Sequence, residues 1–205
     1  MDILKTRFEK ECLVPSDINE HLHHLAKYSE FCNSIVSIGG NASTTLAFAY
    51  GLLKHAFEEK KLILNFATLK DVNEVLHLTK DLTILKIEFQ WKNNLEADFE
   101  SCDILFIDSW HVYGQLKREL DAYAPKVKNY IIMHDTVVDE LYGESIRERM
   151  NIALQSEKTG IPENEIRCGL QKAIFEFLEN YQTTWMIEAR YKNNHGLVIL
   201  KRIDN

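Results

Sequence analysis

Five short apolar runs alternate with helical segments along the first two thirds of the chain, and this alternation constrains the fold more than any other sequence feature. Strands are predicted at 34–40, 61–67, 82–89, 102–108 and 129–135, with helices at 43–59, 71–80 and about 112–123. Strands interleaved with helices in this way predict an α/β fold, with a doubly wound, mostly parallel sheet and helices on both faces.

The two ends of the chain are predicted to complete a single domain over 1–205. Residues 1–33 form an N-terminal helical segment, in which a helix at 16–32 begins with Ser16 or Asp17 as a cap. A charged stretch of weak periodicity, 137–168, is either a solvated surface or a lid or acceptor-binding insertion. A helix at 169–180 follows. The chain then closes with an antiparallel hairpin whose turn is Asn193-Asn194-His195-Gly196.

Composition excludes several classes of function. The chain of 205 residues has 24 basic and 31 acidic residues and a net charge of −7, with no cluster of lysine or arginine, so we expect neither nucleic acid nor an anionic membrane as a partner. No apolar run approaches the ~20 residues of a membrane helix, and the N-terminus lacks the apolar core of a signal peptide. The four cysteines lie far apart, which favours reduced thiols and a cytoplasmic location.

A glycine turn follows the first predicted strand, within "VSIGGNASTT" (36–45). Gly39 and Gly40 let the backbone approach a ligand closely, and Ser43 or Thr44 can cap the helix that follows. The N-terminus of that helix favours an anionic or carboxylate-bearing ligand. A tight turn without any ligand explains these residues equally well. The GxGxxG and phosphate-loop patterns are both absent, which argues against hydrolysis of nucleoside triphosphates.

Acidic and histidine side chains stand where two of the predicted strands end. The fourth strand ends at Asp108 and the fifth at His134 and Asp135. Neighbouring strands lie about 4.8 Å apart, so we expect these side chains to converge, and two facing carboxylates favour a cation between them. Oxygen ligands with one imidazole suit Mg²⁺ or Mn²⁺. His111, three residues after Asp108, is predicted to be a general base, because an imidazole pKa of about 6.5 suits that role.

Simpler structural roles compete with these assignments. Asp108 can instead cap a helix, and His134 can pack against the sheet, but three or four such residues at two adjacent strand ends favour the functional interpretation. Trp110 and Tyr113 either line the pocket or pack in the core. A further group of histidines is predicted to be a solvated helix face and not a metal site: His21, His23 and His24.

The stretch "CDILFIDSWHVYGQLKRELDAYAPKVKNYIIMHDT" (102–136) resembles the region between the fourth and fifth strands of class I S-adenosylmethionine-dependent methyltransferases. An Asp-x-x-His unit and a later acidic pair ending in Asp-Thr recur in their small-molecule O-methyltransferases. The nearest mechanistic likeness is to metal-dependent sugar O-methyltransferases that modify deoxysugars of macrolides and related glycans. "PSDINEHL" (15–22) and "NNHGLVILKR" (193–202) also resemble small bacterial and viral members. The resemblance covers nearly the whole chain.

This resemblance implies a Rossmann-like fold with a seven-stranded sheet, S-adenosylmethionine as cofactor, and a divalent metal. It implies that Asp108 and Asp135 ligate the metal, that His134 stands where the sugar enzymes carry a glutamate ligand, and that His111 and Asp108 act in catalysis. Ser37 departs from the family, which usually has an acidic residue there, and no acidic residue clearly follows the second strand to hold the ribose. The residues expected to contact the cofactor are Gly39, Gly40, Asn41, Ser43, Thr44, Ser109 and Trp110.

The activity that the resemblance implies is methyl transfer to a sugar hydroxyl of a glycan or deoxysugar. The metal would bind two oxygens of a vicinal diol, His111 would accept a proton, and the oxygen would attack the methyl carbon in line. A catechol or other small diol is an alternative acceptor. A less favoured alternative activity is the hydroxylation of antibiotic precursors, with which a related family that has the same metal site is associated. A third interpretation is a degenerate domain that binds a partner or glycan without turnover. We expect a small-molecule or glycan acceptor, and a homodimer.

Overall fold

One sheet organises the molecule, in a computed structural model that describes residues 1–56, 58–65 and 73–204. Its seven strands have the order β3-β2-β1-β4-β5-β7-β6. Strands β1 to β5 run parallel, and β7 is antiparallel to both β5 and β6. The strands are β1 Ser34–Gly39, β2 Lys60–Asn65, β3 Leu85–Gln90, β4 Cys102–Asp108, β5 Val127–His134, β6 Trp185–Tyr191 and β7 Leu197–Arg202. The predicted mostly parallel sheet with a C-terminal antiparallel hairpin is therefore confirmed.

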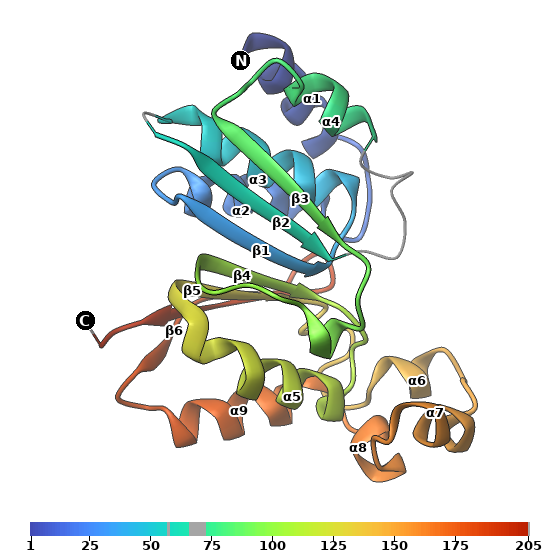
Figure 1. The fold of residues 1–205 in the computed structure, drawn as a ribbon. Helices are drawn as coiled ribbons and strands as arrows, with labels where there is room; N and C mark the ends of the chain where they lie inside the picture. Colours follow the sequence, from blue (N-terminus) through green and yellow to red (C-terminus); the bar gives the residue numbers. More distant parts are fainter. Residues whose placement is uncertain (57, 66–72, 205) are drawn as a thin grey trace.

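Helices cover both faces of this sheet (Figure 1). One face carries α1 Asp2–Cys12, α2 Leu22–Ser29, α3 Ala42–Lys54 and α4 Asn73–Thr79. The other carries α5 Tyr113–Tyr123 and α9 Leu170–Asn180. Three short helices of the predicted insertion lie together beyond the carboxyl ends of the strands: α6 Glu144–Arg147, α7 Ile152–Thr159 and α8 Glu163–Arg167. Single 3-10 turns occur at Asn19–His21, Asn94–Glu96 and Ala124–Lys126.

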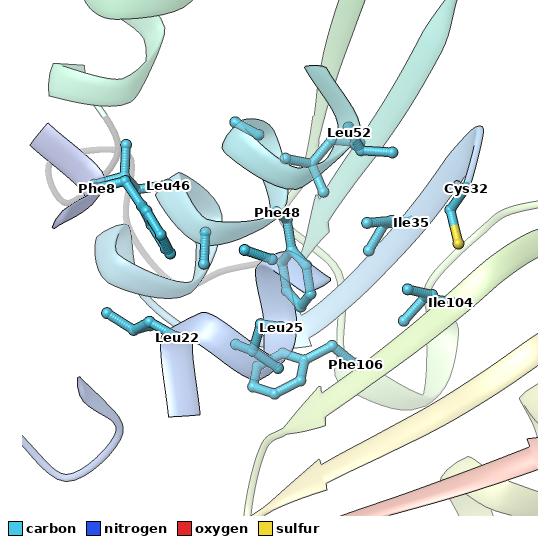
Figure 2. Close-up of a cluster of buried hydrophobic side chains, with 14 of the residues drawn as sticks. Phe8, Leu22, Leu25, Cys32, Ile35, Leu46, Phe48, Leu52, Ile104 and Phe106 are labelled. Carbon is cyan, nitrogen blue, oxygen red and sulfur yellow. The ribbon is translucent and has the colours of Figure 1, made fainter. Parts of the chain in front are cut away.

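The core has two layers because successive side chains of a strand point to opposite faces. Ile35 of β1 packs with α2 and α3, whereas the next residue, Val36, packs on the side of α5 and α9. Figure 2 shows the first layer, where Phe48 of α3 meets Phe106 of β4 edge to face at 5.3 Å between ring centroids. The near-continuous apolar sequence of β4 follows from this burial on both faces.

The order of the strands reverses between β1 and β4, which pair with β2 and β5 on their outer sides. In open parallel sheets, ligands bind beyond the carboxyl ends of the strands at such a reversal. Gly39 and Asp108 face each other in register at this point. The fold therefore places the predicted glycine turn and the predicted acidic site side by side.

Several predicted boundaries differ from the structure. The predicted helix 16–32 is a 3-10 turn followed by the shorter α2, which ends at Ser29. The helix predicted over 43–59 ends at Lys54, because His55 leaves the helical conformation. The strand predicted from residue 82 begins at Leu85, since the backbone before it is used in a turn in which the Leu85 N–H donates to the Leu82 carbonyl. Parts of two predictions, strand residues 66–67 and helix residues 71–72, lie outside the described residues.

The described residues contain no helix that combines the length and apolar character needed to cross a membrane. All four cysteines are free thiols, and three of them are buried: Cys12, Cys32 and Cys102.

Candidate active site

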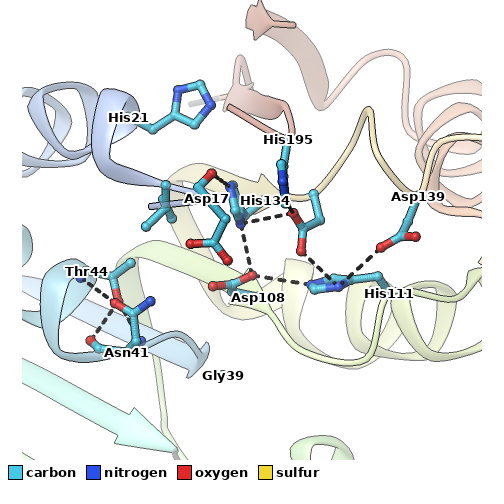
Figure 3. Close-up of polar contacts among 12 residues, drawn as sticks. Asp17, His21, Gly39, Asn41, Thr44, Asp108, His111, His134, Asp139 and His195 are labelled. Atoms are coloured by element: carbon cyan, nitrogen blue, oxygen red, sulfur yellow. Dashed lines mark hydrogen bonds and ion pairs between the residues drawn. The ribbon is translucent and has the colours of Figure 1, made fainter. Parts of the chain in front are cut away.

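The carboxyl ends of β4 and β5 meet, as the sequence predicts. These strands pair in parallel with Ile107 opposite Met133, so the next residues, Asp108 and His134, are neighbours. Oδ1 of Asp108 lies 3.2 Å from Nδ1 of His134 and 3.3 Å from Nε2 of His111 (Figure 3). The predicted convergence of these side chains is therefore confirmed.

Asp135 approaches the same imidazole from the other side. Its Oδ2 lies 3.1 Å from Nδ1 of His111, whereas Asp108 is near Nε2, so the ring stands between the two carboxylates. One ligand atom each from Asp108, His111 and Asp135 lie within 4.8 Å of one another. The backbone of Asp135 has a φ of 55°, a left-handed conformation that non-glycine residues rarely adopt and that often marks functional sites.

Several carboxylates surround the His111 imidazole, but they do not satisfy the hydrogen-bonding capacity of both ring nitrogens. Carboxylate oxygens of Asp139 and Glu144 lie 3.6 Å from its Nδ1, in addition to that of Asp135. Nevertheless this buried Nδ1 has no hydrogen-bond partner. Burial disfavours the charged ring, but the hydrogen bond with Asp108 and the charge of Asp135 outweigh burial and raise the pKa of His111. An unpartnered nitrogen among carboxylates is a donor set that fits a divalent cation.

His134 is more deeply enclosed than Asp108, His111 and Asp135. It is 2% exposed, and its Nε2 lies 3.1 Å from the carbonyl oxygen of Asp17 and 3.3 Å from that of Asn194. Burial opposes its charge, but Asp108 outweighs this effect and raises the pKa of His134 to about 9. Both ring nitrogens thus face acceptors, and the ring acts as the positive partner of Asp108. A direct ligand role for His134 stays a prediction.

The carboxyl group of Asp108 is correspondingly stabilised as an anion. Burial would raise its pKa, but the hydrogen bonds with His111 and His134 lower that pKa well below its ordinary range. Asp108 is therefore ionised throughout the neutral range. It does not serve as a helix cap, because the residue before α5 is Val112, which makes no side-chain cap bond.

His195, which the sequence predicts only as a turn residue, lies in the site. Its Nδ1 lies 3.0 Å from Oδ1 of Asp135, and its side chain is 45% exposed, so it is the most open imidazole of the cluster. β7 pairs with β5 with Leu197 opposite His134, so the turn before β7 must lie against the end of β5. That pairing is the signal that would have revealed it.

Two acidic residues of the 137–168 segment were also missed. Asp139 is completely buried and forms a two-pronged ion pair with Arg147, at 2.8 and 2.9 Å. Glu144 accepts a hydrogen bond from the backbone N–H of His111 at 3.2 Å, and its own N–H donates to the His111 carbonyl at 2.9 Å. The segment predicted to be a lid or insertion is thus bonded directly to the site.

The glycine turn is required by the approach of β1 to β4. Gly39 has a φ of 75°, and a Cβ at this position would lie 1.9 Å from the Asp108 carbonyl oxygen. The helix cap that follows is Asn41, and not Ser43 or Thr44 as predicted. Asn41 is extended, so its short side chain reaches the N–H groups of Ser43 and Thr44 at 2.9 and 3.1 Å. Thr44 completes the capping box by accepting from the Asn41 N–H at 3.0 Å.

β2 ends at Asn65, an amide residue, at the position where class I methyltransferases hold the ribose of the cofactor. Asn65 is buried, and its side chain exchanges two hydrogen bonds of 3.1 Å with the Lys92 backbone. Ser37 is also buried and donates to the Gly39 carbonyl at 3.3 Å. Two positive-φ glycines and a helix N-terminus at the strand reversal fit a cofactor there, but these two positions supply no carboxylate to it.

The remaining predicted residues have structural partners. Trp110 packs against the small apolar cluster under α7 and α8, and its indole N–H donates to Ser145 at 3.1 Å. Tyr113 is buried in the core, and its hydroxyl donates to Glu176 at 2.7 Å. Of the two roles weighed for these aromatic residues, packing is the one that the structure shows, and a cofactor contact of Trp110 stays a prediction.

The prediction of a solvated histidine face is wrong for His21. Its ring is completely buried, with Nε2 at 3.0 Å from the Asn193 carbonyl oxygen and 3.1 Å from that of Asn194. The cause is long-range, because the segment before α2 runs along the hairpin turn. His23 is exposed as predicted.

No protein-family model and no curated protein matches the sequence. Among solved structures, a protein of Corynebacterium glutamicum has a TM-score of 0.62 at 12% identity, over 100% of this chain and 92% of the other. An O-methyltransferase family protein of Burkholderia thailandensis has a TM-score of 0.57 at 11% identity, and the match spans 90% of this chain but 55% of the other. A methyltransferase of Podospora anserina with bound S-adenosylhomocysteine has a TM-score of 0.52 at 12% identity, over 99% and 95%. The chain therefore has the Rossmann-like fold of class I methyltransferases.

Proposed function

We propose that this chain is an S-adenosylmethionine-dependent O-methyltransferase that modifies a sugar hydroxyl with the help of a divalent metal. The observation that carries the proposal is the convergence of Asp108 and Asp135 on one imidazole beside the glycine turn. The fold, shared with a methyltransferase that binds S-adenosylhomocysteine, supports the choice of cofactor. The shared fold of an O-methyltransferase family protein supports oxygen as the methylated atom.

The carboxylates of Asp108 and Asp135 are the groups that would hold the metal, with the His111 ring between them. When bound, S-adenosylmethionine supplies the methyl group, and a divalent ion supplies charge that favours ionisation of an acceptor hydroxyl. His111 is the residue that we propose as proton acceptor, because its Nδ1 is free of hydrogen bonds. Glu144 orients it through the two bonds to its backbone.

The polarity of the site favours a polyhydroxylated acceptor. Ionised carboxylates only accept hydrogen bonds, and sugar hydroxyls can donate to them. The half-open ring of His195, which contacts Asp135, lies at the exposed side of the cluster, where an acceptor can reach it. A flat aromatic diol would use fewer of these groups, so a sugar is the acceptor class that the site supports better.

The test is to incubate the protein with S-adenosylmethionine, Mn²⁺ or Mg²⁺, and a panel of methyl glycosides and catechols. We expect a glycoside to gain the mass of one methylene, and excess EDTA to abolish the gain. Full turnover in EDTA would remove the metal from the proposal. Methylation of catechols alone would replace the sugar by the alternative acceptor.

A further inference from the structure

A buried carboxyl group lies directly behind the site and is used by none of the steps above. Glu119 of α5 is 0% exposed. Its two carboxylate oxygens lie 2.7 and 2.9 Å from the hydroxyl of Ser109, and one of them also accepts from the side-chain amide of Gln115 at 2.8 Å. Within the part of the chain that the structure describes, no basic side chain pairs with Glu119. A buried acid without a cation is costly, which is a reason to ask what it does.

Ser109 stands at the junction of the glycine turn and the carboxylate cluster. It follows Asp108, and its backbone nitrogen would lie 3.0 Å from a Cβ added to Gly39. It is also among the residues that we expect to contact the cofactor. A group that orients the Ser109 hydroxyl therefore affects the contacts that a ligand can make at the carboxyl ends of β1 and β4.

The protonation state of Glu119 decides which way that hydroxyl donates. An ionised carboxylate only accepts, so the Ser109 hydrogen must point inward, and the hydroxyl presents only lone pairs to a ligand. A protonated Glu119 can donate to the Ser109 oxygen instead. The Ser109 hydrogen is then free to point outward, toward an acceptor on the ligand.

Both states are accessible in the neutral range. Burial raises the pKa of Glu119 to about 7, while the donors Gln115 and Ser109 and the charge of His111 act in the opposite direction. On the same helix, the buried Tyr123 has its own pKa raised by burial and in part by Glu119. Three other groups of α5 pair with acids of the helices packed on it: Tyr113 and Lys117 with Glu176, and Arg118 with Glu165.

We propose that Glu119 is a positioning residue that sets the hydrogen-bond polarity of Ser109 toward the cofactor. With Glu119 ionised, Ser109 accepts a hydrogen bond from an N–H or O–H group of the adenosyl cofactor. Removal of the negative charge turns the same hydroxyl into a donor and weakens cofactor binding. This inference rests on the cofactor assignment made under the proposed function.

The experiment is calorimetric titration of the protein with S-adenosylhomocysteine on both sides of pH 7, for wild type and Glu119→Gln. Glutamine mimics the protonated acid, because its amide donates to Ser109 and its carbonyl accepts from Gln115. We expect equal affinities at the acidic side. With rising pH the wild type should become the tighter binder, to roughly fivefold, the value of one hydrogen bond. The difference between the two proteins isolates Glu119 from the histidines, which titrate in both.

Glu176→Gln is the matched control, since it neutralises a partly exposed acid that pairs with the same helix. It should keep the wild-type dependence on pH. Ser109→Ala should lose that dependence, and adding Glu119→Gln to it should change nothing further. Circular dichroism checks the folding of each variant, and if Glu119→Gln does not fold, Ser109→Ala alone decides the question.

The outcomes separate the inference from the function on which it rests. A ratio of wild-type to Glu119→Gln affinity that does not change with pH, or one that changes equally when both proteins also carry Ser109→Ala, would overturn the inference and leave the cofactor assignment intact. Failure of the wild type to bind S-adenosylhomocysteine at every pH would overturn the cofactor assignment, and the inference with it.

Discussion

At the scale of single residues, the site is a set of charges that compensate one another. Asp108 pairs with His111 and His134, and Asp135 pairs with His111 and His195. Each group is stabilised by its neighbours and costly to bury alone, so the loss of one member leaves an uncompensated charge. Substitutions in this cluster therefore need a measurement that separates a loss of chemistry from a loss of folding.

His111→Ala should lower turnover by about a hundredfold or more, which is the usual contribution of a general base. It should change the affinity for S-adenosylhomocysteine far less, because the glycine turn contacts Asp108 and not His111. Steady-state rates and calorimetry on the same preparation compare the two effects. His23→Ala, at an exposed position, is the control. Near-normal turnover of His111→Ala would exclude this residue as the base.

The raised pKa of Glu119 predicts that the free energy of unfolding depends on pH. Its pKa is about 7 in the folded chain, against 4.5 as the ordinary value, so folding disfavours the ionised form. The free energy of unfolding should therefore fall as the pH rises from 4.5 to about 7, and its Glu119 contribution should be constant above that.

Glu119→Gln should not suffer this fall, and its stability relative to wild type should rise over the same window by up to about 3 kcal/mol. Urea denaturation of both proteins at several pH values measures the difference. A difference that does not vary with pH would show that the carboxyl group is not perturbed by its burial.

At the scale of elements, the parallel pairing of β1 with β4 brings the glycine turn against Asp108. Gly39 touches the Asp108 backbone so closely that no side chain fits between the two strands. The chain must also turn there with positive φ before α3 begins at its Asn41 cap. One glycine thus satisfies both a steric and a conformational requirement.

Gly39→Ala should be strongly destabilising, by about 3 kcal/mol or more, because overpacking against backbone adds to the strain of positive φ. Gly160→Ala is a matched control. It has nearly the same φ, 72° against 75°, but a Cβ there meets nothing within 4 Å, so it should cost only about 1 kcal/mol. Chemical denaturation measures both variants, and equal losses would mean that the contact with Asp108 contributes nothing.

At the scale of the whole molecule, two segments far apart in the sequence meet beside the site. The segment before α2 and the turn between β6 and β7 exchange several hydrogen bonds. For example, Asn194 donates through its side chain to the Ser16 carbonyl at 2.7 Å and accepts from the Glu20 N–H at 3.0 Å. This turn carries His195, and its Asn194 carbonyl oxygen lies 3.3 Å from Nε2 of His134. The site is therefore complete only when the segment before α2 and the turn between β6 and β7 are docked on each other.

A metal that binds the assembled site should stabilise the entire fold, because the unfolded chain has no such site. At a hundredfold excess over its dissociation constant, Mn²⁺ should add about 2.7 kcal/mol. That gain corresponds to roughly 5–10 °C in the melting temperature of a domain of this size. Asp135→Asn should lose this shift. Differential scanning calorimetry without any substrate gives the result, and an equal shift in Asp135→Asn, or none in wild type, would contradict the proposed site.

The fold and the centre of the site can be predicted from short segments of the sequence. Apolar runs that alternate with helices specify a parallel sheet, and parallel strands bring their carboxyl ends to one edge. Asp108 and Asp135 could therefore be placed together from the sequence, since each directly follows or ends a recognisable strand. The C-terminal hairpin was likewise predicted from its turn residues.

Only the tertiary structure decided which other side chains reach this edge. His195, Asp139 and Glu144 lie on turns and on a segment of weak periodicity, whose paths depend on contacts between residues far apart in the chain. His21 and Glu119 have the residue types of a surface and are nevertheless buried. Periodicity specifies which face of an element is apolar, but the burial of a polar residue depends on what another part of the chain places over it.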